Sequence, residues 1–545
     1  METIRRRITA LFVLCALAAC SQVQTGSGSG GRHSWTRPDE LRVATWANPN
    51  TLNPLLTSNT SDTFLSSLAF DQLVTIDAKG NDIPRLAQTV PTIANGGVSK
   101  NGLTITYHLR PNIKWQDGVA LTSKDIKFSW QAIMNSKNNV ASRRGYDVVN
   151  SVDTPNAQTV VFHLKSAFAP FVDTVFGESD TPYAVVPEHL LAKYDNLNQI
   201  PFNSLPIGSG PFRVAEWVRG DHITYVANDA YYLGAPKLRK IIVHIVTDDN
   251  TREAQLRAHE VDFANDISSP IVHDLRGVNG VKVILAASPS YESLDFNLKR
   301  PPLDELAVRQ AITYAIDTDR IIHTVEFDTA DRATADLATN SWAYNAALKP
   351  YPFDPAKAQQ ILDQAGWKVG ANGIRAKNGT PLSIQLVYGQ GNPTGQRIGV
   401  IAQSTLGRVG IDVQLKTYNY TVLYAQAQDG GILNGGKFDM ALYAWIAGAD
   451  PDNSSQWTCA FIPPAGNNVS RYCNQQFDAL ENHAFTTPDR AMRKPDYAKI
   501  EAMLAHDLPA DFLFYPKRRY AVNPDLQNFD PNGISEGWNA YLWSI

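Results

Sequence analysis

Apolar and polar residues alternate most clearly in the window from Gly208 to Phe263. Two alternating runs between residues 212 and 226 flank the turn residues Arg219-Gly220-Asp221, which predicts a β-hairpin. The next run, Leu238–Val246, is apolar at both parities, so we expect a third strand that is covered on both faces. The window therefore predicts one continuous piece of sheet.

The rest of the chain carries further strand and helix patterns. Strands are predicted at 41–46, 104–109, 159–164, 261–263, 294–297, 382–388, 411–415, 439–445 and 512–515. Helices are predicted at 60–73, 122–132, 304–315, 356–365, 395–409 and 496–507, and after Asn250, with Glu253 completing a capping box. Because strands and helices alternate between 382 and 415, we expect the second half of the chain to contain a mostly parallel sheet with helices on both faces.

Short motifs follow one another in a characteristic order within the same window. GSGPF at 208–212 precedes W-x-x-G at 217–220, NDAYYLGAP at 228–236 comes next, and Glu260-Val261-Asp262 closes the window. In this order they resemble extracytoplasmic solute-binding proteins of the dipeptide and oligopeptide class, which serve ABC importers. Most of these residues are expected to form turns, sheet and helix rather than to contact a ligand.

The resemblance implies an α/β fold with two lobes, the periplasmic-binding-protein or Venus flytrap fold of class II (cluster C), with an extra inserted subdomain. The chain has 545 residues, which is more than a single domain with one hydrophobic core usually contains. We expect the core of the first lobe at 40–82, 206–290 and 516–545, the inserted subdomain at 83–205 and the second lobe at 291–515. The connections near 290–296 and 508–517 are the expected hinges.

The first residues have the composition of an export signal. Three arginines at 5–7 precede the apolar run 8–19, which is too short to span a bilayer, and Leu17-Ala18-Ala19-Cys20 is similar to a bacterial lipobox. We predict a signal peptide at 1–19, a lipidated Cys20 and a flexible tether at 20–39. An ordinary secretory signal cleaved nearby is the alternative. Either way the protein is expected outside the cytoplasm, in the periplasm or at the cell surface, and lipidation would anchor it to the membrane.

Cys459 and Cys473 are the only cysteines after Cys20. Two cysteines 14 positions apart in an exported chain favour a disulfide. A zinc site would need more ligands, and His483 is the only histidine nearby. A disulfide in the same loop is also implied by resemblance to the dipeptide-binding branch of the family.

Charge and composition give no indication of nucleic-acid binding or catalysis. Residues 1–19 hold three arginines and one glutamate, so their removal takes the formal charge from −4 to −6. The basic groups Arg143-Arg144 and Lys517-Arg518-Arg519 are short enough to be solvated surface. The 11 histidines lack metal-site spacing and no catalytic motif stands in a supporting context. We expect neither a cofactor, nor a bound metal, nor an enzyme.

The segment 438–480 is the richest in candidate binding residues. Trp445 should emerge from a strand into the cleft next to Ala444, and the small residues that follow would let an extended peptide approach the main chain. In the family's peptide binders an aspartate three residues after this tryptophan pairs with the α-ammonium group, but Gly448 stands there. Asp450, which precedes Pro451, either replaces that acid or is a structural loop carboxylate.

Other candidate ligand contacts are polar loop residues and aromatic side chains. Asn48 and Asn53 lie in a loop that faces the cleft in the family, with turn formation as the alternative. Trp342, Tyr344 and Trp457 could stack on sugar rings, although each is also suited to a core. The resemblance implies a monomer that binds a peptide or peptide-like solute and works with permease and ATPase subunits. An oligosaccharide or a metal chelate, of the nickel, opine or glutathione type, is the alternative ligand.

Overall fold

The computed structural model describes residues 31–57 and 60–545. The predicted signal peptide, Cys20 and most of the predicted tether lie outside the described residues. Residues 37–545 form one compact unit, which contains two large sheets. Among the helices of the described ranges, none combines the length and the apolar character that crossing a membrane requires.

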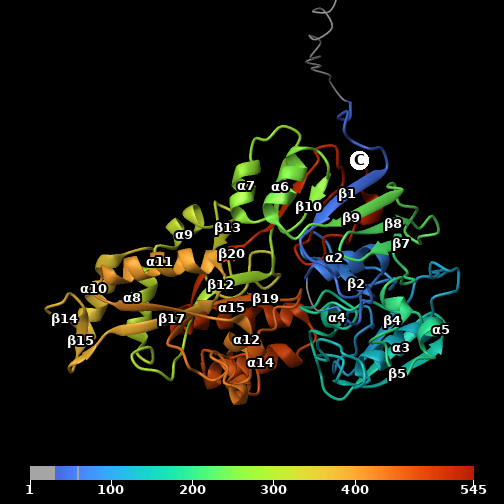
Figure 1. The fold of residues 1–545 in the computed structure, drawn as a ribbon. Helices are drawn as coiled ribbons and strands as arrows, with labels where there is room; N and C mark the ends of the chain where they lie inside the picture. The colour runs from blue at the N-terminus through green and yellow to red at the C-terminus, as the bar shows by residue number, and fades with distance from the viewer. Residues whose placement is uncertain (1–30, 58–59) are drawn as a thin grey trace, which may run out of the picture. The chain divides into compact units, whose positions relative to one another are not determined.

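A seven-stranded sheet collects strands from three separate parts of the chain (Figure 1). In spatial order it contains β11 (Lys282–Ala286), β21 (Arg518–Val522), β10 (Phe263–Ala264), β1 (Glu40–Thr45), β9 (Lys240–Ile245), β8 (His222–Ala227) and β7 (Phe212–Val218). The predicted hairpin is confirmed as β7 and β8, which pair antiparallel. The helices α6 (Asp249–Arg257) and α7 (Ser269–Leu275) lie near β10.

Two local predictions in this region are wrong. Only Ile241 and Val243 of β9 are fully buried, so the strand is fully covered on one face and only partly on the other. Helix α6 is capped by Asp248, whose side chain accepts from Thr251 N at 2.8 Å, and not by Asn250. An aspartate two positions earlier captures the first free N–H groups, so the helix already begins at Asp249.

The glycines of the GSGPF turn permit a close contact between backbones. A Cβ atom at Gly208 would lie 1.8 Å from the carbonyl oxygen of Ala69, and one at Gly210 would lie 2.5 Å from that residue's carbonyl carbon. Gly210 N donates to the same oxygen at 2.8 Å. The turn therefore locks onto the end of α2 (Thr60–Ala69), which is a structural role.

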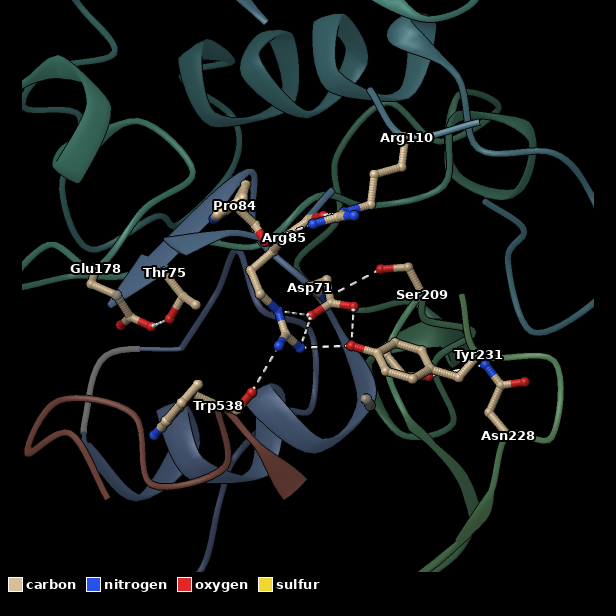
Figure 2. Close-up of polar contacts among 12 residues, drawn as sticks. Asp71, Thr75, Pro84, Arg85, Arg110, Glu178, Ser209, Asn228, Tyr231 and Trp538 are labelled. Carbon is tan, nitrogen blue, oxygen red and sulfur yellow. Dashed lines mark hydrogen bonds and ion pairs between the residues drawn. The ribbon is translucent and has the colours of Figure 1, made fainter. Parts of the chain in front are cut away.

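A buried ion pair continues this contact (Figure 2). Arg85 donates to Asp71 Oδ1 from Nε at 3.0 Å and from Nη2 at 2.6 Å, and to the Trp538 carbonyl from Nη1 at 2.9 Å. The Tyr231 hydroxyl donates to Asp71 Oδ2 at 3.0 Å, and Ser209 Oγ accepts from Asp71 N at 3.1 Å. Ser209 and Tyr231, which belong to the motifs that resemble the family, thus stabilise the packing around the Arg85–Asp71 ion pair.

Between α2 and β7 the chain forms a smaller antiparallel sheet and short helices. The strands are β4 (Thr104–His108), β6 (Thr159–Leu164) and β5 (Val149–Asn156), and β2 (Val74–Ile76) pairs with β3 (Asp82–Pro84). Helix α3 (Ser123–Met134) begins close to the predicted start, and Thr122 and Asp125 form a reciprocal capping box there. The short helices are α4 (Phe171–Thr174) and α5 (Glu188–Leu191).

The second large sheet has six strands and mixed directions. Its order is β13 (Ala330–Arg332), β20 (Ala510–Pro516), β12 (Ser290–Phe296), β19 (Met440–Ile446), β17 (Ser383–Gly389) and β18 (Asp412–Tyr418). β17 runs parallel to both β18 and β19, but the pairings of β12 with β19, β12 with β20 and β13 with β20 are antiparallel. The prediction of a mostly parallel sheet is wrong here. Strand β12 follows β11 of the seven-stranded sheet along the chain and β20 precedes β21 of that sheet, and β12 and β20 run in opposite directions.

Helices cover this sheet and extend beyond it (Figure 1). They are α8 (Leu306–Ala315), α9 (Thr318–Thr324), α10 (Pro355–Gln364), α11 (Pro393–Gly407), α12 (Tyr420–Leu423), α13 (Ser454–Trp457), α14 (Gln475–Thr486) and α15 (Arg490–Asp507). A small sheet adds β14 (Lys368–Val369), β15 (Arg375–Lys377) and β16 (Thr380–Pro381). Helix α15 begins six residues earlier than predicted, because Asp489 caps it and Pro495 lies inside it.

We call the part built on the seven-stranded sheet, with the smaller sheet of β4 to β6, lobe 1, and the part built on the six-stranded sheet lobe 2. The chain passes from β11 to β12 through residues 287–289 and returns from β20 to β21 through Lys517. The division into domains predicted from the sequence stays a prediction.

Candidate ligand-binding site

Strand β19 carries Trp445 to the contact between the lobes. Trp445 lies on the same face of the strand as Tyr443, and the two rings are nearly parallel, 16° apart with centroids at 6.5 Å. Trp445 is half-buried, whereas Ala444 on the other face is exposed and lies outside the cavities described here. Trp445 lines two adjoining cavities, as expected for an aromatic residue in a binding cleft.

The two cavities share residues from both lobes. The larger has a volume of about 860 Å³, and the smaller has about 50 Å³. Both are lined by Ser142, Arg144, Phe168, Asp180 and Trp445. A solute in the larger cavity would therefore touch lobe 1 and lobe 2 at once.

The loop after β19 packs directly against lobe 1. Ala449 N donates to the Glu178 carbonyl at 2.8 Å. A Cβ atom at Gly448 would lie 2.9 Å from Ser179 Cα and 3.0 Å from Asp180 N. Any larger residue at 448 would push the two lobes apart, so the glycine suits this close approach.

Side chains also join the lobes on either side of the cavities. Arg144 of lobe 1 forms an ion pair with Asp452 and donates to Ser455 Oγ at 3.3 Å. Arg490 of lobe 2 forms ion pairs with Asp82 at 2.8 Å and Asp173 at 2.5 Å. These reciprocal pairs stabilise the lobes in contact.

Asp450 is bound by an arginine of its own lobe. Its two carboxylate oxygens accept from Arg493 Nη1 at 2.6 Å and Nη2 at 2.7 Å. Both side chains are buried, and Tyr497 Oη accepts a further bond from Arg493 at 3.0 Å. Burial lowers the pKa of Arg493, but the neighbouring carboxylate of Asp450 more than offsets this effect, so that the pKa is raised overall. This geometry supports the structural role of Asp450 over an ammonium anchor.

Trp457 lies in the core of lobe 2, Trp342 and Tyr344 are half-buried against that core, and none of the three lines the cavities at Trp445. Trp457 is 1% exposed, and its Nε1 donates to Asp336 Oδ2 at 2.7 Å. Arg490 and Arg493 lie over the ring of Trp342, at 5.4 Å and 5.3 Å from its centroid. The ring of Tyr344 makes an edge contact with the ring of Tyr515, which is buried in the core.

The asparagine candidates have different environments. Asn53 is fully buried, where Oδ1 accepts from Leu55 N at 3.1 Å and Nδ2 donates to Asn203 Oδ1 at 3.0 Å. It therefore acts in the turn that follows β1. Asn48 is exposed in the same loop and does not line either cavity at Trp445.

The predicted disulfide between Cys459 and Cys473 is present. It closes a loop that supplies Ala460, Phe461 and residues 465–467 to the wall of the larger cavity. The crosslink thus fixes one side of the candidate site.

Several carboxyl groups near the cavities have raised pKa values. Burial raises the pKa of Asp173 to about 8, although Arg490 opposes this shift. Burial likewise raises the pKa of Glu178 to about 7, against the effect of a hydrogen bond from Thr75. Burial, then Asp452 and Asp336, raises the pKa of Glu481 well above its usual range. The contact region between the lobes thus contains buried acids.

Sequence analysis missed Arg144, Asp180 and Glu481 as cavity residues. No local motif marks them, since their proximity to Trp445 depends on how the lobes meet. The interpretation of Arg143 and Arg144 as solvated surface is wrong: Arg144 pairs with Asp452, and Arg143 donates to three backbone carbonyls. In residues 31–57 and 60–545, no group of three or more histidine, cysteine, aspartate or glutamate side chains is arranged to hold a metal ion.

Comparisons with known proteins agree with this architecture. The oligopeptide-binding protein AppA of Bacillus subtilis is 27% identical over 555 aligned positions, covering 99% of both chains. Its structure with a nonapeptide covers 93% of this chain and 99% of its own, with a TM-score of 0.73 and 26% identity. NikZ of Campylobacter jejuni, in complex with Ni(L-His), covers 94% of this chain and 100% of its own, with a TM-score of 0.75 and 27% identity.

The family model of bacterial extracellular solute-binding proteins, family 5 (middle region), matches residues 83–463. This match includes the lobe 1 side of the candidate site and strand β19 with Trp445. The predicted two-lobed α/β fold is confirmed. The chain belongs to the bacterial extracellular solute-binding proteins, family 5.

Proposed function

We propose that this protein is the substrate-binding component of an ABC importer, and that it encloses a peptide or peptide-like solute between its lobes. The observation that carries the proposal is the cavity of about 860 Å³ at Trp445, which is lined from both lobes next to the main chain of β19. An aromatic wall beside a strand suits an extended ligand. The oligopeptide-binding relative from Bacillus subtilis supports a peptide.

Capture would proceed by hinge closure about residues 287–289 and Lys517. The Arg144–Asp452 and Arg490–Asp173 pairs would form as the lobes meet over the solute. We propose Trp445 and the main chain at Gly448 as ligand contacts, and solute binding without chemical turnover. The division into a lobe 1 core, an insertion at 83–205 and a lobe 2 at 291–515 is part of this proposal.

A metal chelate is the second candidate solute. NikZ, the relative solved with Ni(L-His), matches nearly the full length of this chain. Within the part of this chain that the structure describes, no cluster of side chains could hold the metal unaided. A metal would therefore have to arrive already bound to a chelator.

We further propose that Cys20 is lipidated, that the protein acts as a monomer at the periplasmic side of a membrane or at the cell surface, and that permease and ATPase subunits receive the solute. A Cys20→Ala variant should then leave the membrane fraction. If that variant partitions with membranes as the unmodified protein does, lipid anchoring at Cys20 is wrong.

Mass spectrometry of solute released from natively purified protein tests the proposed function. We expect short peptides, and calorimetric titration with a released peptide should show one binding site. Recovery of a nickel chelate instead, with no binding of peptides, would contradict the peptide proposal.

A further inference from the structure

The wall of the larger cavity is acidic. Phe461 and Phe485 contribute apolar surface, but four carboxylates from both lobes also line the cavity. These are Asp147, Asp180, Asp478 and Glu481.

The arginines of the same wall offset these acids only in part: burial raises the pKa of Asp180, and the nearby Arg144 lowers it by less. Arg144 forms its ion pair with Asp452, and Arg143 donates to three backbone carbonyls in the last turn of α3 and the loop that follows it. In residues 31–57 and 60–545, neither arginine forms an ion pair with the four carboxylates. The cavity thus presents an excess of negative charge to whatever occupies it.

Glu481 is the most unusual of the four. It lies on α14 one helical turn from Asp478 and Phe485. It is 1% exposed, and neither carboxyl oxygen accepts a hydrogen bond from the described part of the chain. A buried carboxyl without partners is costly unless it stays protonated or a cation reaches it.

Asp180 faces the same space from the opposite lobe. It lines both cavities together with Trp445, and among the described residues it forms no ion pair. The face of a tryptophan attracts ammonium and guanidinium groups, and a nearby carboxylate adds charge complementarity. Trp445 and Asp180 thus offer two independent attractions for a positive group.

We propose that this cavity selects solutes of net positive charge, and that Asp180 and Glu481 recognise an ammonium or guanidinium group that lies against Trp445. The inference rests on the proposed function, since it states which peptides the receptor prefers. A neutral or acidic solute would cover the exposed carboxylate of Asp180 and leave the buried carboxyl group of Glu481 without a partner, which disfavours its binding.

Binding of a cation should be linked to proton release. Asp452, Asp336 and Asp450 surround Glu481 with negative charge and Arg493 partly offsets them, so burial and these neighbours favour its protonated form. A bound cation would favour the ionised form and expel the proton. Affinity for a basic solute should therefore increase with pH until Glu481 ionises without ligand.

Calorimetric titration with Ala-Arg-Ala, Ala-Leu-Ala and Ala-Glu-Ala, which share their termini, tests the inference. We expect Ala-Arg-Ala to bind at least about tenfold more tightly than Ala-Leu-Ala, and Ala-Glu-Ala to bind most weakly. Titrations in two buffers of different ionisation enthalpy should show proton release with Ala-Arg-Ala. Glu481→Gln should abolish the release, and both it and Asp180→Asn should reduce the preference.

Asp195→Asn is the matched control, because it removes the same charge from lobe 1 at a side chain that is 75% exposed and lines neither cavity. Equal affinities for the three peptides would overturn the inference and leave the proposed function intact. Binding of spermidine but of no tripeptide would keep the inference and contradict the peptide function. Binding of neither spermidine nor any tripeptide would overturn the inference.

Discussion

Gly448 and Asp450 differ in what surrounds them, although only two positions separate them. Gly448 lies against the backbone of lobe 1 at Ser179, where a side chain would collide. Asp450 points to Arg493, which occupies both of its oxygens. The acid closest to Trp445 in sequence is therefore engaged by the protein itself.

Replacing Asp450 should reduce stability more than affinity. In Asp450→Asn, Arg493 keeps its charge in a buried site without its partner, so the free energy of unfolding should fall by about 3–5 kcal/mol. Peptide affinity should change less than about threefold. Urea unfolding and calorimetric titration measure the two effects.

Asp229→Asn is the control, since it breaks an aspartate–arginine pair whose side chains are both mostly exposed, and it should leave stability nearly unchanged. A large loss of affinity in Asp450→Asn at unchanged stability would restore Asp450 as a ligand anchor.

Glu178 should make stability depend on pH. Its pKa is raised to about 7 by burial, so the folded protein keeps a proton that the unfolded chain loses above its ordinary pKa. Stability should therefore fall as pH rises from about 4.5 through about 7, by up to about 1.4 kcal/mol per unit. Urea unfolding at pH 5 and pH 8 should show a smaller difference for Glu178→Gln. An identical pH dependence in both proteins would contradict this account.

At the scale of elements, the sequence predicts what local interactions decide. The helix start near Thr122 and the Arg219-Gly220-Asp221 turn are predicted correctly because the contacts that decide them lie within a few residues. The strand directions of the lobe 2 sheet are not predicted correctly, because the pairing of β12 with β20 joins segments about two hundred residues apart. No local pattern encodes that pairing.

The disulfide loop should stabilise both the fold and the site. Cys459 and Cys473 are separated by 14 positions, and closing a loop of about 15 residues contributes about 3 kcal/mol in the chain-entropy model. The double variant Cys459→Ser/Cys473→Ser should lose about this much stability, measured by urea unfolding under oxidising conditions. It should also bind solute more weakly, because Ala460 and Phe461 line the cavity. Unchanged stability and affinity would show that the loop holds its shape without the crosslink.

At the scale of the whole molecule, the site exists only where the lobes meet. Asp180 and Arg144 reach Trp445 from a segment almost three hundred residues earlier in the chain. Sequence analysis found the lobe 2 side because strand β19 and its tryptophan have a local pattern and a family resemblance. It missed the lobe 1 side because contact between lobes has no local signature.

Arg490 should favour the closed arrangement. It pairs with Asp82 and Asp173 of lobe 1 and is about one-third exposed, so its contribution is partly screened by solvent. Arg490→Ala should weaken solute binding by about tenfold and reduce the compaction that small-angle scattering detects on saturation. Arg300→Ala, which removes an ion pair within lobe 2, is the control. Equal compaction and affinity in Arg490→Ala would contradict a role in closure.

Hydrogen–deuterium exchange with and without a saturating bound peptide tests the central claim most directly. If the solute is enclosed at Trp445, segments 142–146 and 178–183 of lobe 1 and 445–452 of lobe 2 should become protected together. Protection should be much weaker in Trp445→Ala at the same peptide concentration. Protection confined to one lobe, or located away from these segments, would contradict enclosure of the solute between the lobes.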